Sequence, residues 1–151
     1  MIDPSLTISI DRTALSLSPL VLVAENATDL GLTDYAEPAL LPRVSYAPTS
    51  DFQHGDVPLG WGWQQTLLNF SFLTIADTEA ESRALVDAVR NAITQGLEYE
   101  VTVTASDAAA EVWTCNPGSL TPAGARTLVN MRHVRPVWSV SLPCYPVRSF
   151  A

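Results

Sequence analysis

The chain has 151 residues, of which 47% are hydrophobic and 16% are charged, and its formal net charge is −8. This length suits one domain with a sizeable core, and this hydrophobic fraction excludes an intrinsically disordered chain. The longest apolar run, Leu20 to Ala24, is too short to cross a bilayer. The N-terminus lacks the basic and apolar regions of a signal peptide, so we expect a soluble protein made in the cytosol.

The charge is unevenly distributed along the chain. Residues 1–111 hold all sixteen acids and four arginines, whereas residues 112–151 hold the other four arginines and no acid. An acidic face of one subunit could meet a basic face of the next, or the last forty residues could lack carboxylates by chance. General nucleic-acid binding is not expected, because each phosphate contact needs a cation and few are available.

The first elements predicted along the chain are two strands. Alternating apolar residues predict a strand over residues 6–10. A second strand is predicted from Leu15 to Val23, bent at Pro19, because proline lacks the N–H that an interior strand needs.

Residues 25–60 change character, and we predict that they form an extended arm that carries a hairpin and is ordered by a partner. Loops of this length are uncommon in a compact domain and are usually functional. The apolar residues Leu40, Leu41, Tyr46 and Phe52 argue against a mere linker. Four prolines and three glycines interrupt the stretch: Pro38, Pro42, Pro48, Pro58, Gly31, Gly55 and Gly60.

Trp61 and Trp63 straddle Gly62, so a strand would carry both rings on one face. Packing in the core or on the sheet is one interpretation. The other is an exposed aromatic surface for a neighbouring subunit or a sugar.

A strand, a helix and a second strand follow without interruption over residues 64–105. Alternating apolar residues predict the strand 64–75 and, after the helix, the strand 97–105. Thr78 and Glu81 form a capping-box pattern at the helix start, and Gly96 is placed where a left-handed residue would end the helix.

The C-terminal part of the chain predicts a hairpin and a final strand. The strand 97–105 and a return strand at residues 112–115 form an antiparallel hairpin, and Asn116-Pro117-Gly118 is a turn signal. The last strand is predicted over residues 134–142 and ended by Pro143 and Pro146. About seven strands and one helix indicate a mainly β fold, a β-sandwich or split barrel flanked by a single helix, with a long extended arm; we treat residues 1–151 as a single domain.

Candidate catalytic residues are few. His54 stands near Ser50, Asp51 and Asp56, but no nucleophile elbow or metal-ligand spacing accompanies it, and a turn explains these residues better. His133 lies beside Arg132, which disfavours its protonation. Glu98 and Glu100 would face one side of a strand about 7 Å apart, a separation that a glycosidase can use. A solvated strand face explains this pair more simply, so we expect no enzyme, no cofactor and no metal.

Cys115 and Cys144 lie on apolar strand patterns 29 residues apart. Buried free thiols are the favoured interpretation, since a disulfide would require adjacent strands and an oxidising compartment.

Three stretches together resemble one family. They are residues 46–65, which contain Tyr46-Ala-Pro48-Thr-Ser50-Asp51-Phe-Gln-His54 and Gly60-Trp61-Gly62-Trp63; the strand, helix and strand unit; and Trp113 to Gly118 with His133 to Pro143. In this order they resemble a minor tail protein of long-tailed bacteriophages (siphoviruses) with the tail-tube or distal-tail fold, over residues 44–147.

The resemblance implies a structural subunit of a phage tail rather than an enzyme. Such subunits form a homo-oligomeric ring, commonly of six, around a channel. Their partners are tube, tape-measure and hub proteins, with DNA only as passing cargo and no membrane. The protein would be part of the virion tail and would be assembled in the cytoplasm of the bacterial host. The interface residues that we expect are Tyr46, Phe52, His54, Trp61, Trp63, Arg132 and Arg135.

Two other functions remain open at this point. One is a carbohydrate-binding β-sandwich of a tail or cell surface, with Trp61 and Trp63 as stacking platforms. The other is a small hydrolase that uses His54 or the pair Glu98 and Glu100.

Overall fold

The computed structural model describes residues 5–24, 30–39, 42–47, 57–63, 66–105, 109–122 and 137–150. The strands are β1 (Thr7–Ile10), β2 (Leu20–Val23), β3 (Leu30–Ala36), β4 (Pro42–Ala47), β5 (Val57–Trp63), β6 (Thr66–Thr74), β7 (Tyr99–Thr104), β8 (Glu111–Cys115), β9 (Ser119–Pro122) and β10 (Val137–Phe150). One α-helix, α1 (Glu79–Ile93), follows β6, and a 3-10 turn spans Thr13–Leu15.

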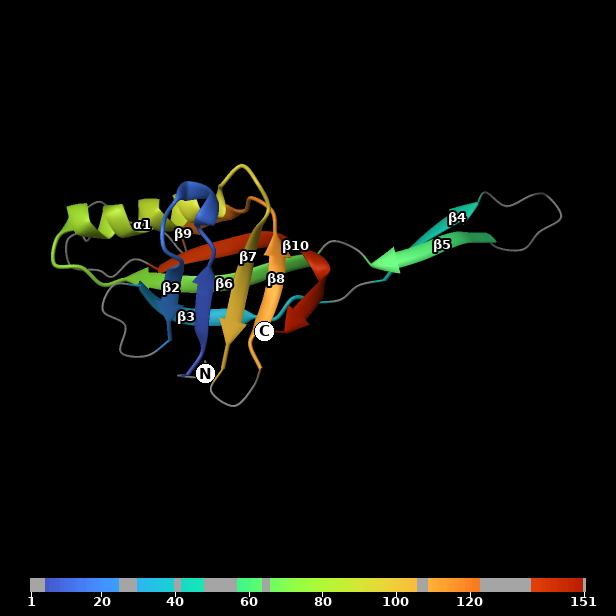
Figure 1. The fold of residues 1–151 in the computed structure, drawn as a ribbon, viewed down its shortest axis with the longest axis horizontal. Helices are drawn as coiled ribbons and strands as arrows, with labels where there is room; N and C mark the ends of the chain where they lie inside the picture. The colour runs from blue at the N-terminus through green and yellow to red at the C-terminus, as the bar shows by residue number, and fades with distance from the viewer. Residues whose placement is uncertain are drawn as a thin grey trace.

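Seven strands close into a barrel, in the order β6-β3-β2-β1-β7-β8-β10, with β10 pairing back onto β6. An eighth strand, β9, adds to β10, and β4 and β5 form a separate two-stranded sheet. The barrel is joined at β2 and β3 by one parallel pair, Val23 with Gly31, whereas its other pairs are antiparallel. The predicted fold class, mainly β with one helix and an arm, is therefore confirmed (Figure 1).

The core follows from the period-2 alternation of the strands. In β6 every second residue from Thr66 to Thr74 is buried, and in β10 the same holds from Trp138 to Cys144. The predicted β7–β8 hairpin is also present. One expectation was wrong: Leu97, predicted on the buried face, precedes β7 and has 69% of its surface exposed.

Strand β10 changes partner along its length, which explains why prolines do not end it. Its first half pairs with β6 and β9, and its second half pairs with β8 after a register shift between Cys144 and Arg148. The Pro143 carbonyl accepts from the Asn116 N–H at 2.8 Å. Proline has no N–H to return to the Asn116 carbonyl, which accepts instead from the Tyr99 hydroxyl at 3.2 Å. The prediction that this strand ends at Pro143 and Pro146 was therefore wrong.

Helix α1 lies along one end of the barrel (Figure 1). The Thr78 hydroxyl accepts from the Glu81 N–H at 3.2 Å, as predicted, while the Glu81 carboxylate accepts from the Asp77 N–H at 3.2 Å. The first bond satisfies an N–H of the first turn, and the second satisfies the N–H of the residue before the N-cap. Four residues of the helix are buried: Val86, Val89, Ala92 and Ile93.

The helix ends differently from the prediction. Thr94 is the C-cap, and both its N–H and its hydroxyl donate to the Arg90 carbonyl, while the Gln95 amide donates to the Ala92 carbonyl. Gly96 does not adopt a left-handed backbone. Side-chain donors therefore take the place of the predicted glycine stop.

The segment before β2 also differs from the prediction. Residues 15–18 are not a strand: Thr13–Leu15 forms a 3-10 turn that ends at Ser16 with φ 57°. Asp11 Oδ1 accepts from the N–H and the hydroxyl of Thr13, at 3.0 and 2.6 Å. Such local bonds compete with a strand ladder, so the alternation at these residues does not produce a strand.

The predicted arm is shorter than residues 25–60. Its hairpin is present as β4 and β5, but residues 30–36 form β3, which pairs with β6 in the barrel. Residues 25–29, 40–41, 48–56 and 64–65 lie outside the described residues. No helix in the described part of the chain has the length and apolar character of a membrane span.

Candidate functional site

The hairpin of β4 and β5 projects from the barrel as a finger (Figure 1). Its antiparallel ladder runs from Pro42 opposite Trp63 to Ala47 opposite Val57, with a register shift between Ser45 and Tyr46. Strands that pair only with each other are marginally stable in water unless a hydrophobic face is covered. This finger is therefore the described element that most needs a partner.

Three of the seven predicted interface residues belong to this hairpin. Trp61 is opposite Val44, Trp63 is opposite Pro42, and Tyr46 is opposite Pro58. The other four, Phe52, His54, Arg132 and Arg135, lie outside the described residues. The interface list consequently stays a prediction, as does the hydrolase interpretation of His54.

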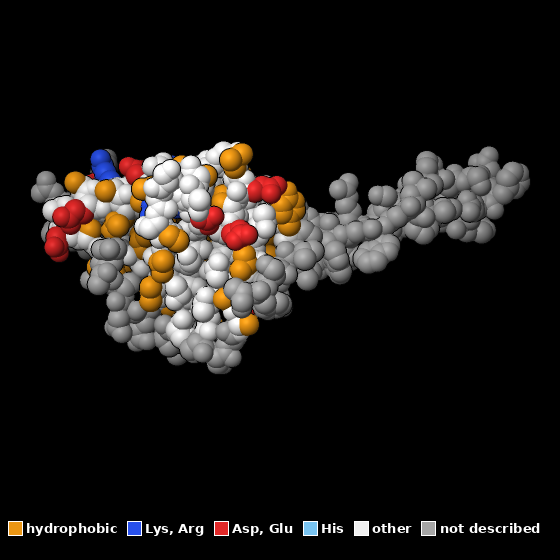
Figure 2. Space-filling model, viewed as in Figure 1, with side chains coloured by type: hydrophobic (Ala, Val, Ile, Leu, Met, Phe, Trp, Pro, Cys, Tyr) orange, Lys and Arg blue, Asp and Glu red, His pale blue; other side chains and the backbone are white. Residues whose placement is uncertain are grey.

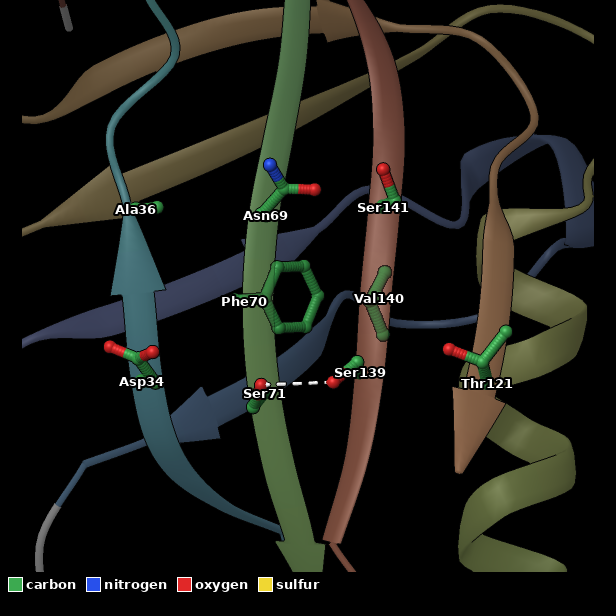
Figure 3. Close-up of a pocket in the computed structure, with 9 residues that line it drawn as sticks. All are labelled: Asp34, Ala36, Asn69, Phe70, Ser71, Thr121, Ser139, Val140 and Ser141. Atoms are coloured by element: carbon green, nitrogen blue, oxygen red, sulfur yellow. Dashed lines mark hydrogen bonds between the residues drawn. The ribbon is translucent and has the colours of Figure 1, made fainter. Parts of the chain in front are cut away.

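A shallow cavity of about 260 Å³ lies on the outer face of β3, β6, β10 and β9 (Figure 3). Two rows of opposed residues cross these four strands. One row runs from Ala36 through Asn69 and Ser141 to Ser119, and the other from Asp34 through Ser71 and Ser139 to Thr121.

The chemistry of this face is that of a polar contact surface. The Ser71 and Ser139 hydroxyls are hydrogen-bonded at 3.3 Å. Asp34 supplies a carboxylate, and its Oδ1 accepts from the Tyr35 N–H at 2.9 Å. The described residues of the lining are mainly hydroxyl, amide and apolar side chains with the single carboxylate of Asp34, so they offer hydrogen bonds to a partner. Strand alternation places Asn69 and Ser71 outward, but sequence alone does not show which strands are neighbours.

The two glutamates considered for a hydrolase, Glu98 and Glu100, lie in different surroundings. Glu98 precedes β7 and accepts a hydrogen bond from the Tyr145 hydroxyl, which raises the pKa of that tyrosine. Glu100 is exposed on β7. The prediction that both glutamates face one side of a strand was therefore wrong, because Glu98 lies before β7 begins. Among the described residues no group of three or more His, Cys, Asp or Glu side chains could hold a metal ion.

Acidic side chains outnumber basic ones on the described part of the face that Figure 2 shows. The described side chains include ten carboxylates and three arginines. Two arginines are already paired within α1, Arg83 with Glu79 at 2.9 Å and Arg90 with Asp87 at 2.8 Å. Arg12 donates to the Ser18 carbonyl at 2.6 Å. Such a surface repels polyanions instead of binding them.

Large apolar side chains are exposed in the connection between β1 and β2 and on β2 itself. Leu15, Leu17 and Val21 have 38%, 54% and 47% of their surface exposed. The hydrogen bonds of Asp11 and Arg12 hold the intervening turn. Neighbouring exposed apolar side chains are typical of contact surfaces. The sequence interpretation missed this surface, because it placed these leucines on a strand.

Cys115 and Cys144 are buried and present as free thiols. They occupy directly opposed positions on β8 and β10. The sequence predicted two buried thiols but did not show that they are neighbours.

The sequence matches no protein-family model and no curated protein. The fold is similar to that of the Dit protein of phage SPP1, described as a paradigm of the hub adsorption apparatus in phages that infect Gram-positive bacteria. The TM-score is 0.58 at 10% identity, over 82% of this chain and 47% of that one. It is also similar to a chain of the phage P2 baseplate in its activated conformation with Ca, with a TM-score of 0.54 at 9% identity, over 92% and 43% of the two chains.

A third similar structure is a chain of the sixfold-symmetrised baseplate of the anti-feeding prophage. Its TM-score is 0.50 at 6% identity, over 100% of this chain and 95% of that chain. This chain spans less than half the length of the first two neighbours. At these identities the likeness shows a shared fold, and it is the fold that the sequence resemblance implied.

Proposed function

We propose that the chain is a structural subunit of a bacteriophage-type tail, which assembles into a ring of six around the tail channel. The observation that carries the proposal is the combination of this barrel fold with a finger that has its own two-stranded sheet. Structures of the same fold come from a phage hub protein and from two baseplates.

The finger supports contact with a neighbouring subunit. A projecting hairpin leaves the outer edges of both its strands available for pairing, and a neighbour that covers it supplies the packing it lacks alone. We assign the interface to Tyr46, Trp61 and Trp63 on this hairpin, together with Phe52, His54, Arg132 and Arg135.

Other tail components are the further partners that we propose: tube, tape-measure and hub proteins. The polar face of β3, β6, β10 and β9 and the apolar turn at Leu15 and Leu17 are two more surfaces on which they could dock. The net charge of −8 suits a channel through which DNA passes without adhering. The protein would lie in the virion tail after assembly in the bacterial cytoplasm, and it would act without catalysis.

Electron microscopy of the purified protein in negative stain tests the proposal. We expect closed rings with sixfold symmetry, or stacks of such rings. Solitary particles at every concentration would contradict ring assembly.

A deletion variant isolates the role of the finger. Pro42 and Trp63 are register partners, so their backbones are close and a short glycine-serine linker can replace residues 43–62. The variant should keep the barrel, because β4 and β5 are not part of its sheet. It should unfold at the temperature of the full chain under conditions where both are monomeric, yet form no rings. Rings that persist in this variant would show that other surfaces drive assembly.

The matched control acts on the apolar turn. Leu17→Ser changes an exposed side chain in the β1–β2 connection and leaves the finger intact. If the finger drives assembly, this variant still forms rings. If the Leu17→Ser variant formed no rings while the deletion variant still did, the subunit interface would lie at the turn and not at the finger.

A further inference from the structure

The two cysteines of the chain occupy one cross-strand site. Cys144 on β10 is the register partner of Cys115 on β8. Both side chains are fully buried, and the sequence has no other cysteine. Each thiol therefore has one possible intramolecular partner.

The ladder around the pair defines the backbone spacing. The Asn116 N–H donates to the Pro143 carbonyl at 2.8 Å, which joins the residue after Cys115 to the residue before Cys144. In an antiparallel ladder this bond flanks a non-hydrogen-bonded pair, whose Cα atoms are about 4.5 Å apart. Disulfides span Cα separations of about 4.4–6.8 Å, so the backbone already meets the requirement.

The two cysteine side chains lie on the same buried face of neighbouring strands, at directly opposed positions. Cys115 Sγ lies 3.8 Å from the Trp113 carbonyl oxygen, to which its S–H can donate. Thiols at opposed positions on one face need no change of strand register to react with each other. The short step that remains is removal of two hydrogens.

From this geometry we propose that Cys115 and Cys144 are an oxidation site, at which a small hydroperoxide converts the two thiols into a cross-strand disulfide. The inference concerns the barrel itself and does not depend on the proposed tail function.

The electrostatics give each cysteine a role. The hydrogen bond with Cys115 lowers the pKa of the Cys144 thiol, and the same bond together with burial raises the pKa of the Cys115 thiol. The direction of these two shifts favours Cys144 as the attacking thiolate and Cys115 as the resolving thiol.

With hydrogen peroxide as the hydroperoxide, the reaction balances with one molecule of oxidant. The Cys144 thiolate attacks one oxygen, the O–O bond breaks, and a sulfenic acid and hydroxide form. Hydroxide takes the proton of Cys115, whose thiolate attacks the Cys144 sulfur and displaces the sulfenic oxygen as a second hydroxide. That hydroxide takes the proton that Cys144 had released, so two thiols and one peroxide give one disulfide and two waters.

The site adjoins an interruption of the sheet, which gives a small oxidant a path. The pairing of β8 with β10 shifts register between Cys144 and Arg148. Opening of the strands beside this shift exposes the thiols without unfolding the barrel. A disulfide here would close a loop of about 30 residues, which corresponds to a rise in Tm of roughly 10 °C.

The test treats purified full-length protein with hydrogen peroxide and measures intact mass after unfolding in the presence of iodoacetamide. We expect a loss of about 2 Da, no alkylation, and a higher Tm that returns to its starting value on reduction. Two alkylated thiols after peroxide treatment, or a disulfide that links two chains on a non-reducing gel, would overturn the proposal.

Two serine variants test the order of attack. Cys115→Ser should stop at a sulfenic acid on Cys144, which a dimedone probe traps, and Cys144→Ser should react with peroxide more slowly at its remaining thiol. Equal rates of dimedone labelling in the two folded variants would contradict the assigned roles. The wild-type mass measurement decides on the disulfide itself even if a variant fails to fold.

Discussion

Adding one methyl group at Gly118 tests how closely the loop between β8 and β9 packs against β10. A Cβ atom added there would lie 2.4 Å from the Ser141 carbonyl oxygen and 2.5 Å from Leu142 Cδ2. Ser141 belongs to β10, whose backbone is held by β6 and β9. The loop must therefore move by about 1 Å to restore ordinary contact.

That movement has a calculable cost. The Gly118 N–H donates to the Ile93 carbonyl at 2.9 Å, and a shift of this size breaks the bond. Overpacking costs about 1–3 kcal/mol, and a lost hydrogen bond costs about 0.5–1.5 kcal/mol. We expect Gly118→Ala to lower the free energy of unfolding by about 2–4 kcal/mol, which corresponds to a fall in Tm of roughly 4–15 °C.

The assay is urea unfolding of the variant and of a matched control, followed by circular dichroism. A Cβ at Gly96 would meet nothing within 4 Å, and its backbone is outside the left-handed region, so Gly96→Ala should be neutral or slightly stabilising. Equal stability of the two variants would refute the close approach of the β8–β9 loop to β10.

Three further substitutions test the helix and its contacts. Val89→Asp places an unpaired charge at a fully buried position and should lower the free energy of unfolding by about 4 kcal/mol or more. The control Asp87→Ala, on the exposed face of the helix, should change it by about 0.5 kcal/mol or less. Similar urea midpoints for the two variants would show that α1 is not docked on the barrel. Thr78→Ala removes the N-cap acceptor and should cost about 1 kcal/mol in the same assay; no change would show that the cap contributes nothing. Tyr99→Phe removes the hydroxyl that donates to the Ile93 carbonyl and should cost about 1–2 kcal/mol at neutral pH.

The same tyrosine gives a pH dependence with a defined sign. Burial raises the pKa of Tyr99, so above a pH of about 10 the unfolded chain ionises first. Its contribution to stability is complete below that pH and is lost as the pH rises further. Wild-type protein should therefore lose stability between pH 9 and pH 11 more steeply than the Phe variant, as measured by urea midpoints. Parallel pH profiles would contradict a buried, protonated hydroxyl.

The elements that the sequence predicted correctly are those with one unbroken period. Alternation over β6 and β7 and helical spacing between Thr78 and Gly96 identify strand, helix and strand, because each has a single buried face. Leu97 continues the alternation in sequence but lies before the strand starts, so periodicity alone does not fix the boundary.

The elements that were missed depend on partners far away in the chain. β3 contains Gly31 and Asp34 and follows a region rich in turn residues, so its place in the barrel comes from pairing with β6 rather than from propensity. β10 passes through Pro143 because Asn116 and Tyr99 satisfy the groups around it, and these bonds require the folded loop.

The candidate surfaces were predictable only in part. A hairpin within the arm was expected from the prolines, glycines and apolar residues, whereas the polar face that includes Asn69 and Ser139 requires knowledge of strand order. Cys115 and Cys144 are 29 residues apart in the sequence, and only the strand order shows that they are opposed on neighbouring strands.

The measurement that tests ring assembly most directly is native mass spectrometry of the purified chain over a series of rising concentrations. The account predicts a discrete species of six times the mass of one chain that grows at the expense of the monomer and is absent when residues 43–62 are replaced. A chain that remains monomeric throughout the series, or that grows into a continuous ladder of masses, would contradict a closed ring of six.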